Sequence, residues 1–116
     1  HGLPWTVFKG HSRTSTYLAD TVNTLANICN KFKPGETYNI GGNKMHTIEE
    51  LSDIIIKITG ADPRLVIYKE SEVLTTKIKK VDTTKSIRDL NHKDSVSLEE
   101  GLTLTANWMR KVYGLN

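Results

Sequence analysis

Cysteine and long apolar runs are the residue features that this chain most clearly lacks. Its 116 residues include one cysteine, Cys29, so no internal disulfide can form, and a lone thiol fits a reducing compartment. No stretch of 18 apolar residues occurs, so we expect no membrane span. The N-terminus has no basic segment followed by an apolar one, so no signal peptide is expected. These features predict a cytoplasmic location.

Aromatic residues and excess charge are also scarce. Aromatic residues make up 7% of the chain, and the formal net charge is only +3. Most of that excess comes from a local basic stretch: Lys77, Lys79, Lys80, Lys85 and Arg88. Binding of single-stranded nucleic acid would call for aromatic residues interleaved with these charges, and residues 77–88 contain none. The composition therefore disfavours nucleic acid as a partner, without excluding a small anionic ligand.

Metal-ligand spacing is absent as well. The four histidines, His1, His11, His46 and His92, have no cysteine partners and no regular separation. We therefore expect no metal site. His11 stands beside Arg13 in the block of residues 10–20 that is described below, but it is not assigned a role.

What the chain does have is an alternation of strand-like and helix-like segments. Alternating or β-branched residues predict extended structure, and apolar residues at helical spacing predict helices. The expected strands are 5–9, 13–17, 37–40 and 65–68, and the expected helices run from Asp20 to about Phe32, 48–59, 83–90 and from 98 onward. Residues 69–80 are expected to be irregular. The fold class predicted is α/β in an α+β arrangement, a small mixed sheet packed with about four helices in one domain, 1–116.

Several helix ends carry capping signals. Thr47 and Glu50 have capping-box spacing, and Ser97 with Glu100 repeats the pattern. Asp20 and Asp82 are interpreted as N-caps rather than catalytic acids. Cys29 falls on the apolar face expected for the first helix, so we expect it to be a buried hydrophobic residue.

Three blocks of sequence, taken together, resemble a known family. They are residues 10–20 (GHSRTSTYLAD); 36–42 (ETYNIGG) with 47–51 (TIEEL); and 81–90 (VDTTKSIRDL) with 98–108 (LEEGLTLTANW). Their order and spacing resemble the C-terminal third of the extended short-chain dehydrogenases/reductases, the NAD-dependent nucleotide-sugar epimerases and dehydratases. The resemblance spans roughly residues 5–113.

This resemblance implies a substrate-side portion that binds a nucleotide-diphosphate sugar. In the family, the arginine of the first block contacts the substrate diphosphate, which implies that role for Arg13. Lys77 lies near a second phosphate-binding arginine of the family, although 75–80 (TTKIKK) departs from the usual pattern. Asn39 lies near the sugar-nucleotide cleft in some members. The alternatives are a solvated Arg13 or one paired with Asp20, a solvated basic loop around Lys77, and a structural hydrogen bond for Asn39.

Two elements of the family's chemistry are missing from the sequence. No glycine-rich strand-to-helix turn is present, because Gly41-Gly42 is not followed by a third glycine and a helix start. No tyrosine is followed four residues later by lysine, whereas the family's catalytic pair needs that lysine to favour the phenolate. We therefore expect no cofactor-binding Rossmann part and no catalytic residue in this chain. NAD(P) belongs to the parent enzyme, and whether this chain is itself an enzyme is left open.

Two hypotheses follow from the sequence. The favoured one is a nucleotide-sugar-binding fragment of an epimerase (isomerase) or dehydratase (lyase) that is not catalytic alone. The alternative is a free-standing basic module that binds a nucleotide or nucleic acid. In the family's arrangement, strands such as the one expected at 37–40 would lie against the missing Rossmann portion. Left alone they would expose edges and apolar surface, which predicts a homodimer or a segment-swapped oligomer.

Overall fold

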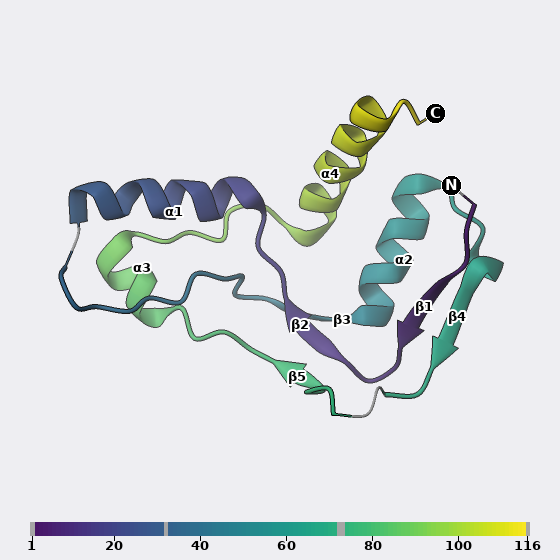
Figure 1. Cartoon of the computed structure of the whole chain (residues 1–116), viewed down its shortest axis with the longest axis horizontal. Helices are drawn as coiled ribbons and strands as arrows, with labels where there is room; N and C mark the ends of the chain where they lie inside the picture. Colours follow the sequence, from purple (N-terminus) through teal and green to yellow (C-terminus); the bar gives the residue numbers. More distant parts are fainter. Residues whose placement is uncertain (1, 32, 72–73, 116) are drawn as a thin grey trace. The chain divides into compact units, whose positions relative to one another are not determined.

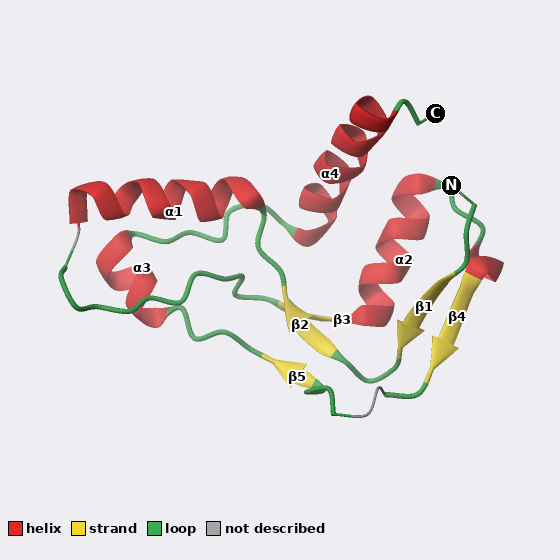
Figure 2. Ribbon diagram, in the orientation of Figure 1, coloured by secondary structure: helices red, strands yellow, loops and turns green. Residues whose placement is uncertain are grey.

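The computed structural model describes residues 2–31, 33–71 and 74–115, and these residues form four α-helices and short strands in two small sheets (Figures 1 and 2). The predicted α/β class with small mixed sheets and four helices is confirmed. The chain divides into two compact units. One comprises residues 1–13, 46–79 and 99–116, and the other comprises 14–45 and 80–98. Each unit is described by itself below.

The first unit is built on a parallel pair of strands. β1 (Trp5–Phe8) pairs with β4 (Val66–Lys69) in the register Trp5↔Val66 to Phe8↔Lys69. α2 (Ile48–Thr59) packs on β1, and the indole N–H of Trp5 donates to Ser52 Oγ at 3.1 Å. Most of α4 (Leu98–Tyr113) belongs to this unit as well. Val7, on β1, is 2% exposed and is the most deeply buried apolar side chain among the described residues of this unit.

α2 forms where its capping signals predict it. Thr47 Oγ1 accepts the N–H of Glu50, while the Glu50 carboxylate accepts the N–H of Thr47, so both halves of the predicted capping box are present. The helix ends at Gly60, whose φ of 69° is the left-handed conformation that glycine adopts without a Cβ penalty. A 3-10 turn, η1 (Pro63–Leu65), then leads into β4 and is capped by Asp62.

A second, three-stranded sheet has the order β3-β2-β5, with bounds Met45–Thr47, Ser12–Thr14 and Ile78–Lys79. β2 and β5 are parallel, in the register Ser12↔Ile78 and Arg13↔Lys79. The prediction that 69–80 is irregular is therefore wrong at Ile78–Lys79. Such a short strand has no periodicity of its own and exists only because β2 offers it hydrogen-bond partners.

The second unit holds α1 (Leu18–Lys31) packed against α3 (Thr84–Leu90). α3 ends at Asn91, which takes the left-handed conformation at φ 54°. Asp82 helps to begin this helix, because its carboxylate accepts the N–H of Thr84 at 3.0 Å. The long segment between α1 and β3 contains no strand in its described part, so the predicted strand at 37–40 is wrong. No neighbouring strand of the described chain pairs with it, and its side chains bond to the α3 region instead.

α1 turns its polar side inward, contrary to the prediction from its apolar spacing. Asp20 and Thr24 are buried, while Val22 and Leu25 are about half exposed at 52% and 50%. Cys29 is also exposed, so its predicted burial is wrong. The buried polar side chains form specific hydrogen bonds within the second unit, and these bonds fix which side of the helix faces inward. Phe32, the predicted end of this helix, lies outside the described residues.

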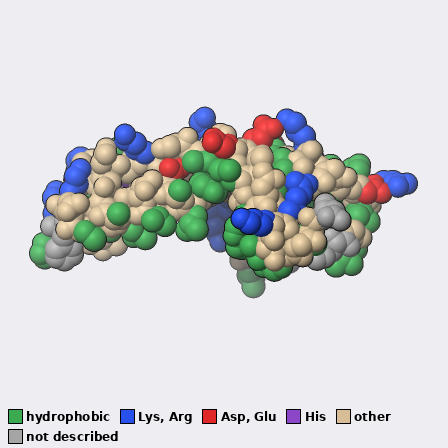
Figure 3. All heavy atoms as spheres, turned by 90° about the horizontal axis from the view of Figure 1, so that it is seen from above, with side chains coloured by type: hydrophobic (Ala, Val, Ile, Leu, Met, Phe, Trp, Pro, Cys, Tyr) green, Lys and Arg blue, Asp and Glu red, His purple; other side chains and the backbone are tan. Residues whose placement is uncertain are grey.

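Large apolar side chains are exposed elsewhere too, as the green atoms in Figure 3 illustrate. On α4 the exposed set is Leu104, Trp108, Met109, Val112 and Tyr113. None of the described helices is both long and apolar enough to cross a membrane.

Candidate anion-binding site

Arg13, the leading candidate from the sequence, lies on β2 in the first unit. Its backbone is held in the β3-β2-β5 sheet, where it pairs with Lys79. Its Nη1 donates to the carbonyl of Ser12 at 2.8 Å and to the carbonyl of Lys77 at 3.0 Å. One guanidinium nitrogen is therefore anchored to the backbone, and the half-buried side chain has a defined position.

The pairing of β2 with β5 brings three cationic residues together. We term Arg13, Lys77 and Lys79 the cationic cluster. Residues paired across neighbouring strands project to the same face of a sheet, so Arg13 and Lys79 share a face. Lys77 is tied in through its backbone, because its carbonyl also accepts the N–H of Ser12 at 2.8 Å. The structure thus places two of the three predicted site residues side by side.

No carboxylate neutralises this cluster among residues 2–31, 33–71 and 74–115. Two other cations of the same unit do have such partners, since Arg64 pairs with Asp62 at 2.7 Å and Lys57 with Glu99 at 2.7 Å. An unpaired arginine beside two lysines is suited to an anion with several oxygens, because a guanidinium fork can donate two parallel hydrogen bonds. The alternative in which Arg13 pairs with Asp20 is not realised, since one Asp20 oxygen accepts the N–H groups of Ser95 and Val96 instead.

Asn39 belongs to the second unit and is exposed. Its Nδ2 donates to the carbonyl of Asp82 at 3.3 Å, which matches the structural alternative for this residue. That bond places it beside a hollow of about 500 Å³ that is lined by Asn43, Lys80, Val81, Asp82, Thr83, Thr84 and Ile87. Within the hollow, the Thr83 hydroxyl donates to Asn43 Oδ1 at 2.7 Å. The N–H and hydroxyl of Thr84 hold the pKa of the Asp82 carboxyl below its usual value.

The glycine pair after Asn39 serves the chain's own packing. A Cβ on Gly42 would lie 2.0 Å from the carbonyl oxygen of Ser15, and one on Gly41 would lie 3.2 Å from Val81. The Gly41 carbonyl accepts a hydrogen bond from His92 Nε2 at 2.8 Å. The space left by the missing side chains is therefore filled by protein, not offered to the phosphates of a dinucleotide.

A network around Asp89 in the second unit was not predicted from the sequence. Its carboxylate accepts from Arg88 Nε at 2.7 Å and lies 3.4 Å from Lys33 Nζ, and these cations hold its pKa well below the usual range. Tyr38 donates its hydroxyl to the same carboxylate at 3.2 Å. Burial and the Asp89 charge raise the pKa of Tyr38 above its ordinary value, which opposes any role as a phenolate base.

Glu36 and Lys85 form a further ion pair beside this network, and Lys85 lowers the pKa of Glu36. The sequence did contain a signal for the network, because the segments 33–36 and 85–89 each contain both basic and acidic residues. Only folding shows that these two segments meet. In the described part of the chain, no three His, Cys, Asp or Glu residues gather in a way that could hold a metal ion.

The sequence and the fold of this chain are similar to parts of known enzymes. A dTDP-glucose 4,6-dehydratase of Streptomyces griseus is 30% identical over 95 residues, which cover 82% of this chain and 29% of that protein. The crystal structure of a UDP-glucose 4-epimerase of Thermotoga maritima with UDP-glucose superposes with a TM-score of 0.86 at 31% identity, covering 97% of this chain and 36% of that one. This chain is a partial-length relative of the extended short-chain dehydrogenases/reductases.

The sequence resemblance to NAD-dependent epimerases and dehydratases is thereby confirmed. A further relative of this family, a dTDP-glucose 4,6-dehydratase of Streptomyces venezuelae solved with NAD bound, matches with a TM-score of 0.85 at 26% identity over 97% of this chain and 36% of that one. No family model matches the chain. The chain spans less than a third of the length of the curated dehydratases that it matches.

Proposed function

We propose that this chain is the nucleotide-sugar-binding, C-terminal portion of an NAD(P)-dependent epimerase or dehydratase, and that it is not catalytic alone. The cationic cluster carries the proposal. An arginine anchored through one nitrogen, with no carboxylate partner among the described residues, has donors left for the diphosphate of the ligand. The proposal is supported by solved relatives, of which one was crystallised with UDP-glucose and another with NAD.

In this proposal Arg13 binds the diphosphate, and Lys77 and Lys79 add charge that attracts it. Asn39 contributes from the segment before Gly41, beside the hollow at Asp82. NAD(P) is held by a Rossmann portion outside this chain. The tyrosine and lysine that activate the substrate are supplied by that portion too, since no tyrosine here has the required lysine partner.

The exposed apolar side of α1 supports the proposal that another part of the enzyme packs against this chain. The outward face of this helix carries the apolar residues Val22, Leu25 and Cys29, whereas its buried side is polar. This arrangement is unusual for a helix whose outer face is exposed to solvent. We propose that the Rossmann portion covers this face in the parent enzyme. When that portion is absent, a second copy of the chain takes its place as a homodimer or a segment-swapped oligomer.

Ligand affinity tests the proposed function. Isothermal titration would compare UDP and dTDP with UMP and with single-stranded DNA at 150 mM salt, which is about physiological ionic strength. We expect the diphosphates to bind more tightly than UMP, because the cluster addresses the second phosphate. Tighter binding of DNA would support the alternative, a basic nucleic-acid module, and would overturn the proposal.

Substitution of Arg13 sharpens the test. We expect Arg13→Gln to weaken UDP binding by about tenfold or more, as loss of a charge-assisted hydrogen bond would. Arg64→Gln is the matched control, because it removes the same charge from the same unit at a residue already paired with Asp62. Equal affinity in the two variants would show that Arg13 does not bind the diphosphate.

A further inference from the structure

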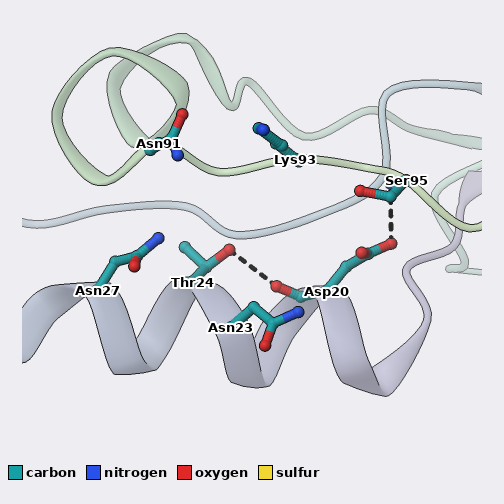
Figure 4. Close-up of a pocket in the computed structure, with 7 residues that line it drawn as sticks. All are labelled: Asp20, Asn23, Thr24, Asn27, Asn91, Lys93 and Ser95. Atoms are coloured by element: carbon teal, nitrogen blue, oxygen red, sulfur yellow. Dashed lines mark hydrogen bonds between the residues drawn. The ribbon is translucent and has the colours of Figure 1, made fainter.

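A small polar pocket in the second unit contains none of the residues proposed above to bind the nucleotide sugar. It has a volume of about 140 Å³ and is lined by Asp20, Asn23, Thr24, Asn27, Asn91, Lys93 and Ser95 (Figure 4). One wall is the inward side of α1, and the other is the segment that follows α3. No aliphatic or aromatic side chain lines it, which distinguishes it from an ordinary packing defect.

The floor of the pocket is fixed by protein hydrogen bonds. Thr24, 1% exposed, bonds to the Asp20 carbonyl at 2.8 Å and to His92 Nδ1 at 2.7 Å. Asp20, 5% exposed, uses one carboxylate oxygen to accept the N–H groups of Ser95 and Val96 at 2.9 and 3.0 Å. Asn27 donates to the Leu90 carbonyl at 2.9 Å. These bonds preorganise the site, since its walls need not rearrange to bind.

Other lining side chains are unused. Among the described residues, the carboxamides of Asn23 and Asn91 and the ammonium of Lys93 have no hydrogen-bond or ion-pair partner. In Figure 4, Asn27 points up from α1, and Asn91 lies on the opposite wall. Each carboxamide carries both donors and an acceptor, and Lys93 adds only donors.

We propose that this pocket binds a small uncharged polyol, of the size of glycerol to a single sugar ring. The single lysine is balanced by one carboxylate, so the lining has no excess charge to hold a phosphate. An ammonium group is not favoured either, because Lys93 already places a positive charge in the lining. Hydroxyl groups both donate and accept hydrogen bonds, so they match the donors and acceptors of the carboxamides. The volume of the pocket equals that of several water molecules, which suits a small polyol.

Titration by NMR tests this site directly. Glycerol and glucose would be added to the ¹⁵N-labelled 116-residue chain to several hundred millimolar, with inorganic phosphate as a separate arm. We expect saturable amide shifts confined to residues 20–27 and 91–96 for at least one of the polyols. Absence of saturation for both polyols, or tighter binding of phosphate at the same amides, would overturn the proposal.

Two substitutions and one control connect the shifts to the pocket. Asn91→Gly removes the carboxamide while suiting the left-handed backbone at φ 54°, and Lys93→Met removes the donors while keeping a similar length. We expect each to weaken polyol binding about fivefold, the loss of roughly one hydrogen bond. Asn30→Ala, on an exposed part of α1 outside the lining, should leave affinity unchanged. Unaltered affinity in both pocket variants, with the fold retained by NMR, contradicts the assignment.

Discussion

Asp20 illustrates how a single carboxylate can serve a tertiary contact where the sequence predicts a local one. The sequence predicts an N-cap, but α1 already begins at Leu18, so Asp20 lies in its first turn. Its carboxylate instead accepts two backbone N–H groups more than 70 residues away, at Ser95 and Val96. The same residue thus joins α1 to the segment before α4 and forms part of the polar pocket.

Removing that acceptor should destabilise the second unit. We expect Asp20→Ala to lower the free energy of unfolding by about 2 kcal/mol, because it leaves two partly buried amides without partners. Asp20→Asn keeps one acceptor oxygen and should cost less. Urea denaturation followed by circular dichroism measures both, with Asp53→Ala on the exposed side of α2 as the reference. A loss for Asp20→Ala no larger than that of the reference would rule out this bridging role.

A glycine is required at position 42 because the backbone of Ser15 lies very close to it. Because a Cβ there would lie 2.0 Å from the Ser15 carbonyl, Gly42→Ala must displace main chain and should destabilise by about 2 kcal/mol or more. Gly41→Ala meets only the Val81 side chain at 3.2 Å, which can yield, so its effect should be smaller. Thermal unfolding of the two variants gives the comparison, and equal losses would contradict this explanation.

At the scale of elements, hydrogen-bond partners rather than periodicity decide which faces and segments become ordered. α1 has apolar residues at helical spacing, yet its polar side is buried because Thr24, Asn27 and Asp20 bond to the segment 90–96. Residues 37–40 have strand-like composition, yet Tyr38 and Asn39 bond to the α3 region as side chains. In both cases the partners lie far away in the sequence.

The ion network of the second unit predicts acid sensitivity. The pKa values of Asp89, Glu36 and Asp82 are lowered in the folded state, so on acidification the unfolded chain binds protons first. Their stabilisation is complete above the ordinary carboxyl pKa of about 4 and is lost as pH falls below it. We expect the urea midpoint to fall between pH 6 and pH 3, measured by circular dichroism.

Asp89→Asn is the informative variant for this acid response. It removes the charge that Arg88 and Lys33 stabilise, so the fall in the urea midpoint with acid should become shallower. Asp53→Asn, a carboxylate on α2 in the other unit, is the control and should retain the parental slope. An Asp89→Asn profile parallel to that of the parent would show that this network does not govern the acid response.

For the molecule as a whole, exposed apolar surface is the dominant feature. Large apolar side chains are open to solvent on both α1 and α4, and the chain spans less than a third of its curated dehydratase relative. Both observations are expected of a part whose apolar faces pack against the remainder of a larger enzyme.

Self-association should report on that surface. We expect sedimentation velocity to show concentration-dependent association of the chain, and Val22→Lys with Leu25→Lys to reduce it, because charges on the apolar face of α1 oppose its burial. The control is the double variant Asn23→Lys with Asn30→Lys. It adds the same charge at polar positions of the same helix and should leave association unchanged. A monomer at every concentration would contradict the prediction.

Local signals in the sequence determined much of this protein. The capping box at Thr47 and Glu50, Gly60 and the run of isoleucines specify α2, because these interactions are complete within one segment. β1, β4 and α4 also form near the expected residues, and the three blocks point to the correct family.

Tertiary structure alone decided the remaining features, because they depend on partners distant in sequence. The two-residue strand β5 exists through its pairing with β2, which in turn brings the Lys77 carbonyl to Arg13. The inward side of α1 is chosen by hydrogen bonds to residues 90–96, against the preference of its apolar spacing. A segment's own periodicity records which face is apolar, but the groups that meet it in the fold determine which face is buried.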